Sequence, residues 1–144
     1  MFGDLLRRLA APSPAPLADV DARLALSALL VRIARADGDY AASEAARIDA
    51  ILARRYGLGP TAAAALRAEA EALEAQAPDT VRFTRAIKDA VAYEERVSVI
   101  EALWTVVLAD GAREAEEDAL MRLAAGLLGV SDVDSALARQ RARG

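Results

Sequence analysis

Apolar positions recur along this chain at the spacing of α-helices. Two stretches, residues 19–36 and 94–109, are apolar around most of the helical circumference, which predicts two central buried helices. The second stretch keeps only a thin polar stripe, made of Glu94, Ser98, Glu101 and Thr105. One-sided apolar patterns predict amphipathic helices over about residues 43–56, 61–76, 79–92 and 114–128, and then a last short helix before a solvated arginine tail. The pattern therefore predicts an all-α protein.

Both central stretches end in the same tripeptide, Ala-Asp-Gly, and a glutamate follows each glycine after six positions. Asp110 and Glu117 stand 73 positions after Asp37 and Glu44, which indicates an internal duplication. A helix–turn–helix unit cannot bury its apolar face alone, so we expect two copies packed against each other around a pseudo-twofold axis. The register of the second amphipathic helix slips by one residue, which makes the break after residue 128 the counterpart of the break after residue 56.

The composition supports this interpretation and narrows the chemistry. A chain of 144 residues fits a single domain, and 55% hydrophobic with only 4% aromatic residues predicts a core of Ala, Leu, Val and Ile. Trp104 is expected in that core, at the interface of the two central helices. The sequence has no cysteine and no histidine, which excludes thiolate and imidazole zinc sites and leaves carboxylates as the metal ligands. A net charge of −4 argues against a nucleic-acid partner, because phosphate binding needs a clustered basic surface.

Prolines set the first 18 residues apart from the rest. Apolar residues within 2–10 fall on one face and predict a short amphipathic helix, while Pro12, Pro14 and Pro16 predict an extended linker. We therefore divide the chain into an N-terminal helix and linker, 1–18, and a helical domain, 19–144. Docking of the short helix on that domain is the favoured interpretation, with a membrane or partner contact as the alternative. The N-terminus lacks the pattern of a signal peptide and no apolar run is long enough to span a membrane, so we expect a cytoplasmic protein.

Acidic residues gather at the two Ala-Asp-Gly turns and are the candidate metal ligands. They are Asp37, Asp39 and Glu44 in the first copy, and Asp110, Glu114 and Glu117 in the second. The spacing from Gly38 to Glu44 is that of the turn glycine and the last glutamate of an EF-hand loop, but the first two carboxylates of that loop are absent. Ca²⁺ and Mg²⁺ are the candidate cofactors, bound weakly by one turn or shared between both. The same acids also suit ordinary turn and helix-dipole chemistry, and this alternative stays open.

Taken together, these features resemble the TerB family, which is named for tellurite-resistance proteins. The resemblance rests on the twin Ala-Asp-Gly turns, the segment YEERVSVIEALWTVVLADG and the Leu-Gly-Val-Ser ending of the second amphipathic helix, and it covers roughly residues 19–140. It implies a bundle of about seven to eight helices and a link to tellurite or other chemical-stress response. In that family the acidic residues of these turns are candidates for a cation site, and no enzymatic activity is implied.

We therefore expect a non-catalytic module that binds a protein partner, alone or in a membrane-associated complex, and that senses a cation. A homo-oligomer is a further candidate assembly. Two alternatives remain open. One is a purely scaffolding helical domain, and the other is an enzyme that uses paired carboxylates, such as Glu94 with Glu95, for acid–base work. The sequence offers that enzyme no phosphate-binding loop and no nucleophile motif.

Overall fold

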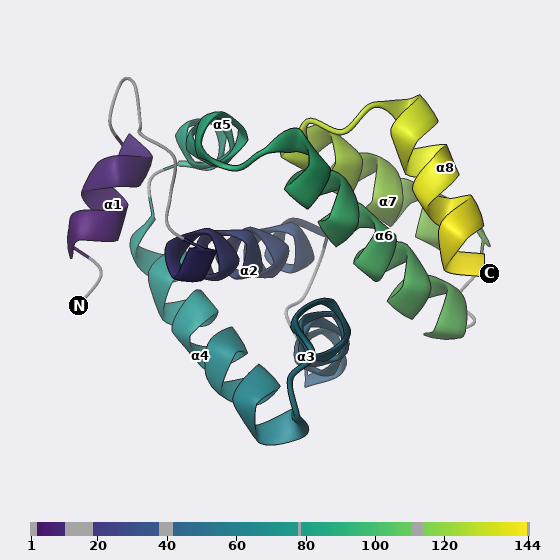
Figure 1. The fold of residues 1–144 in the computed structure, drawn as a ribbon, viewed down its shortest axis with the longest axis horizontal. Helices are drawn as coiled ribbons and strands as arrows, with labels where there is room; N and C mark the ends of the chain where they lie inside the picture. Colours follow the sequence, from purple (N-terminus) through teal and green to yellow (C-terminus); the bar gives the residue numbers. More distant parts are fainter. Residues whose placement is uncertain (1–2, 11–18, 38–41, 78, 111–113, 144) are drawn as a thin grey trace.

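The computed structural model describes residues 3–10, 19–37, 42–77, 79–110 and 114–143, and this part of the chain forms eight α-helices and no strand (Figure 1). The helices are α1 (Gly3–Ala10), α2 (Asp19–Asp37), α3 (Ala42–Tyr56), α4 (Pro60–Gln76), α5 (Thr80–Ala90), α6 (Tyr93–Asp110), α7 (Glu114–Leu128) and α8 (Asp132–Arg143). The prediction of an all-α bundle is confirmed.

Polar residues cap the starts of two helices, α5 and α8, where the sequence places them. The carboxylate of Asp79, immediately before α5, accepts a hydrogen bond from the backbone N–H of Arg82 at 3.1 Å. Ser131 caps α8 in the same way, because its Oγ accepts from the N–H of Asp134, also at 3.1 Å. Such caps satisfy amide groups that have no partner within the helix, so the chain breaks stay at fixed residues.

The last helix, α8, is longer than the sequence pattern predicts. It continues through the arginine-rich tail as far as Arg143, and Arg141 forms an ion pair with Glu101 of α6 at 2.6 Å. Arg141 stays 52% exposed in this ion pair, whereas Arg139 lies over the Trp104 ring with its Nε buried, so the prediction of a solvated tail is wrong for Arg139. The packing of α8 along α6 brings the tail against the polar stripe of α6, which a pattern within one helix does not reveal.

The duplication appears in the structure as a repeated unit of three helices. α2, α3 and α4 form one unit, and α6, α7 and α8 form the other (Figure 1). In each unit the first helix packs against the second and the third. Across the units, α3 packs against α6 and α2 packs against α7, which is the reciprocal pair of contacts that a twofold relation requires. The sequence predicted the first two helices of each unit but not the third as part of the repeat.

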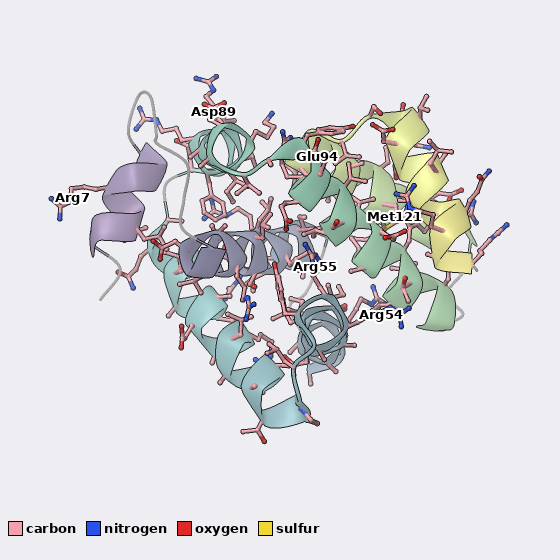
Figure 2. All side chains as sticks on the ribbon, viewed as in Figure 1. Arg7, Arg54, Arg55, Asp89, Glu94 and Met121 are labelled. Carbon is pink, nitrogen blue, oxygen red and sulfur yellow. The ribbon has the colours of Figure 1, made fainter. Side chains whose placement is uncertain are left out.

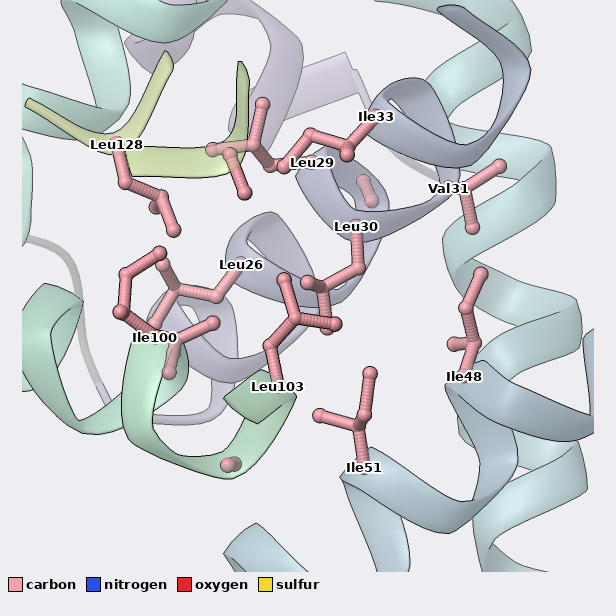
Figure 3. Packing of buried hydrophobic residues seen from close by; sticks show 14 of the residues in the cluster. Leu26, Leu29, Leu30, Val31, Ile33, Ile48, Ile51, Ile100, Leu103 and Leu128 are labelled. Carbon is pink, nitrogen blue, oxygen red and sulfur yellow. The ribbon is translucent and has the colours of Figure 1, made fainter. Parts of the chain in front are cut away.

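Side chains of the two central helices meet in the core. Figure 3 shows Leu26 and Leu30 of α2 facing Ile100 and Leu103 of α6, with Ile51 of α3 beside them. Ile51 and Ile100 are at most 1% exposed. Burying one such side chain contributes about 1.5–3 kcal/mol, so this aliphatic layer holds the two units together.

Trp104 lies in the core with 5% of its surface exposed, but it does not face the other central helix. Its indole N–H donates to Oγ of Ser135 on α8 at 3.2 Å. The guanidinium carbon of Arg139, also on α8, lies 5.0 Å from the ring centroid. Trp104 therefore packs between α6 and α8, and the expected position at the interface of the central helices is wrong. The third helix of the unit covers this face of α6.

The short helix α1 packs against α5, and its Leu5 is buried with 6% exposure. The predicted linker, residues 11–18, lies outside the described residues, so the division at residue 18 stays a prediction. In the described segments, no helix is long and apolar enough to cross a membrane.

Candidate functional site

The predicted acidic residues lie at or next to the helix ends that flank the two turns. Asp37 ends α2 and Asp110 ends α6, while Glu114 opens α7, Glu117 follows three residues later, and Asp39 lies between α2 and α3. The side chains of these five residues are outside the described part of the structure, so their convergence on one ion stays a prediction. Among the side chains that are described, no three acidic groups lie close enough to hold a metal ion.

Glu44 is the predicted ligand whose side chain the structure does describe. It is half-buried in the first turn of α3, where its carboxylate interacts favourably with the partial positive charge of the helix N-terminus. Together with Arg47, one turn further along α3, it lines a cavity of about 30 Å³. Glu44 therefore lies at the start of α3, at the edge of the hydrophobic core.

This cavity lies where the two units meet. Leu30 and Ile33 of α2, Ile51 of α3, Leu103 of α6 and Leu120 of α7 all contribute to its apolar wall. Leu30 and Leu103 are counterparts in the duplication, and Figure 3 shows them facing each other with Ile51 close by. A volume of about 30 Å³ holds about one water molecule, so the cavity is a packing gap between α2, α3, α6 and α7 and not a substrate pocket.

Two residues of the Glu-Glu-Arg segment near the start of α6 bind the C-terminal ends of other helices. The carboxylate of Glu95 accepts a hydrogen bond from Nη2 of Arg55, in the last turn of α3, at 2.5 Å. Nη1 of Arg96 donates to the backbone oxygen of Leu128, the last residue of α7, at 2.7 Å. Arg96 satisfies a carbonyl at the end of α7, and the positive charges of Arg55 and Arg96 interact favourably with the negative ends of the helix dipoles. The segment thus ties both units together at one place.

The hypothesis of a paired carboxylate at Glu94 and Glu95 is not supported by their placement. Both residues are exposed, and adjacent positions on a helix do not face each other. Glu95 is also engaged by Arg55. These two acids therefore serve the helix start and an ion pair.

Tyr56, the last residue of α3, lies next to this ion pair. The guanidinium carbon of Arg23 is 4.5 Å from the centroid of its ring. Burial raises the pKa of the Tyr56 phenol above its ordinary value, and the positive charges of Arg55 and Arg23 counter part of that rise. Arg23 and Arg96 are counterparts in the duplication, and each contacts the C-terminal end of the second helix in a unit. The internal repeat relates Arg23 to Arg96 in the sequence. It does not predict that Arg23 contacts the Tyr56 ring or that Arg96 binds the Leu128 carbonyl.

Comparisons with known proteins agree with the architecture. The family model described as tellurite resistance protein TerB matches residues 23–140. The match covers most of the chain, begins within α2 and ends within α8, and leaves out α1. Searches of curated proteins and of solved structures return no match.

Proposed function

The chain belongs to the TerB family of tellurite-resistance proteins, and from this premise we propose that it is a non-catalytic module that senses a divalent cation and binds a protein partner. The module acts in the response to tellurite or related chemical stress. We place it in the cytoplasm, with a partner that is free or part of a membrane-associated complex.

The position of Glu44 carries the cation part of this proposal. Glu44 lies in the first turn of α3, a few residues after the acidic turn in the sequence, and lines the cavity where α2 and α3 meet α6 and α7. A cation that binds Glu44 would therefore contact α3, the helix that packs against α6 of the other unit. Ca²⁺ or Mg²⁺ fits, because both prefer carboxylate and carbonyl oxygens. Ion binding can change how the two units pack only if the ion has a higher affinity for one packing arrangement than for another. This difference in affinity is what would make the domain a sensor.

Exposed apolar side chains on α8 support a protein partner. Val133 is 69% exposed and Leu137 is 45% exposed, and their separation of four residues puts them on the same face of the helix. Together they form a small apolar area on the exposed face of α8, which is the candidate contact surface for this partner. A second copy of the chain is one candidate partner for this face.

Thermal melting tests the cation part. We compare the wild-type protein with Glu44→Gln in calcium or magnesium and in chelator. Wild type is expected to melt higher with the ion, with a stabilisation of ~2.7 kcal/mol when the ion is at a hundredfold excess over Kd. Glu44→Gln should lose most of the response. Glu69→Gln, an equal charge change at an exposed site of α4, should keep it. A wild-type melting temperature that ignores both ions, or an equal response in Glu44→Gln, contradicts the cation role.

The two turns are expected to contribute unequally. Ala112 stands in the second copy at the position of Asp39 in the first, so the first turn has one more carboxylate there. Asp37→Asn alone should therefore remove most of the ion response, and Asp110→Asn should remove less. The reverse order contradicts the assignment of the first turn as the main site.

Affinity capture tests the partner part. Wild type and the double variant Val133→Ser, Leu137→Ser are compared in cell extract, each with calcium and with chelator. The expected result is a protein that wild type retains only with the ion and that the double variant does not retain. Retention by both forms under both conditions contradicts a cation-controlled partner at this face.

A further inference from the structure

We propose that a groove between α3, α6 and α8 binds an oxyanion, either as a free ion or as the phosphoryl group of a small molecule. The groove measures about 420 Å³. Its lining includes Arg54 and Arg55 of α3, Ser98, Glu101 and Thr105 of α6, and Arg141 of α8. The site is separate from the acidic turns, and it does not depend on the proposed cation sensing.

The lining carries a surplus of positive charge, which suits an anion. Three arginines and one glutamate line this groove, and Glu95 pairs with Arg55 from outside the lining, which leaves an excess of one positive charge. The whole chain carries a net charge of −4, so a local surplus of positive charge is unlike its general surface. Guanidinium groups form charge-assisted hydrogen bonds with oxyanions, often through two N–H groups at once.

Donor groups remain available in the groove. Arg54 is exposed in the last turn of α3, and it has no ion-pair partner among the described residues. Figure 2 shows it between α3 and the lower part of α6. Nη2 of Arg55 is held by Glu95, but its Nε is buried and has no hydrogen-bond partner in the described structure. Because this Nε is closed to solvent, the exposed guanidinium of Arg54 is the donor group that an anion in the groove meets.

On one side of the groove, the Glu101 carboxylate already binds an arginine that an anion would otherwise bind. Its Oε1 accepts from Nε of Arg141 at 2.6 Å, and both side chains are partly exposed. An exposed ion pair of this kind contributes little to stability, so it can open at low cost. Glu101 therefore acts as an internal competitor for Arg141.

The groove also explains the polar stripe of α6. Three of the four stripe residues, Ser98, Glu101 and Thr105, line it. The fourth, Glu94, is exposed beyond it. Its size lies in the range of small-molecule sites, about 300–1,000 Å³, and exceeds what inorganic phosphate alone fills. The geometry thus favours an anionic head group with a small polar body.

Nuclear magnetic resonance titration tests the proposal. Labelled full-length protein is titrated with inorganic phosphate and, separately, with glycerol 3-phosphate at constant ionic strength. Saturable shifts are expected at Arg54, Arg55, Ser98 and Arg141. Arg54→Gln should weaken both probes by about tenfold, the loss of one charge-assisted contact. Arg85→Gln, the same charge change at an exposed site of α5, should leave the affinity within about twofold of wild type.

Glu101→Gln gives a change in the opposite direction. It frees Arg141 and removes a negative charge, so both probes should bind more tightly. Tighter binding of the ester than of phosphate identifies a phosphoryl-bearing small molecule, and equal binding identifies the free ion. The proposal is overturned if neither probe gives saturable shifts, if Arg54→Gln and Arg85→Gln weaken binding equally, or if Glu101→Gln weakens it.

Discussion

Gly57 and Gly129 have the same backbone conformation, with φ of +63° and +67°, just after the ends of α3 and α7. After each glycine, the next N–H donates to a carbonyl five residues earlier, at 3.0 Å and 2.9 Å. This is the Schellman ending of a helix, which needs a left-handed residue at the position that glycine fills. The two endings are 72 positions apart, one fewer than the two Ala-Asp-Gly turns, and this confirms the predicted slip of one residue.

The two glycines predict unequal costs for the same substitution. Alanine in the left-handed region costs about 1–2 kcal/mol at either site. At Gly57 a Cβ meets no atom within 4 Å, but at Gly129 it would lie 2.5 Å from Cδ of Lys88 and 2.9 Å from Nη1 of Arg96. Gly129→Ala should therefore lower the free energy of unfolding more than Gly57→Ala, because it also displaces the Arg96 cap of α7. Denaturant unfolding measures both, and equal losses would contradict this account.

Trp104 gives a prediction for the packing of α8. Trp104→Ala should destabilise the protein by ~3–5 kcal/mol, the usual cost of deleting a large buried aromatic side chain. Ser135→Ala leaves the buried indole N–H without its acceptor and should cost ~1–3 kcal/mol. Native fluorescence is expected to be blue-shifted and protected from quenchers. A red-shifted, freely quenched emission would place the indole in solvent and contradict the structure.

The sequence predicted elements whose signal lies within one segment. The apolar pattern of residues 114–128 gave the bounds of α7, and the repeated turns gave the relation between the two units. It did not predict the contact of Arg141 with Glu101, 40 positions apart, because such pairs depend on how one helix is placed along another. The burial of Glu74 is a similar case, since nothing in an alanine-rich, acid-flanked helix marks one glutamate as internal.

The same distinction holds for the candidate site: features within one segment could be predicted, and features made by several helices could not. Acidic residues after each central helix were visible in the sequence, and Glu44 indeed lies in the first turn of α3. Its contribution to a cavity between the two units was not visible, because that cavity is made by four helices. The arginine groove escaped prediction for the same reason, since its residues come from three helices.

Removal of residues 1–18 should leave a cooperatively folded domain. The two three-helix units lie entirely within the remaining chain. The truncation should lower the stability modestly, because it removes Leu5, which is buried against the rest of the protein. We expect a loss of about 1.5–3 kcal/mol, the value of one buried leucine, with a single sharp transition in denaturant. Insolubility or a broad transition in the truncated chain would instead make α1 part of the core.

Glu74 holds α4 to α2 through a buried ion pair. Its carboxylate lies 3.3 Å from Nε of Arg32 and 3.2 Å from Nε of Arg35. The Arg32 side chain is only 12% exposed and loses a charged acceptor in Glu74→Ala, but it keeps the backbone oxygen of residue 74 and the ring of Phe83. The substitution should therefore cost ~1.5–3 kcal/mol. Arg35 is 46% exposed, and Arg35→Ala should cost at most ~1 kcal/mol. Glu69→Ala, at an exposed site on the same helix, serves as the control, and a loss as large as that of Glu74→Ala would show a helix effect only.

Tyr56 makes the stability of the protein sensitive to alkaline pH. Burial raises the pKa of its phenol above the ordinary value of 10.0, so the folded state holds this proton more tightly than the unfolded chain does. Its contribution to stability is therefore complete below pH ~10 and is lost as the pH rises from there through the raised value. Tyr56→Phe keeps the ring beside Arg23 but removes the titrating group. The variant should match wild type at neutral pH and lose less stability at alkaline pH, as measured by denaturant unfolding. The difference in phenolate absorbance between the two proteins should titrate above the ordinary range, and a difference titration at or below it would contradict the burial of this phenol.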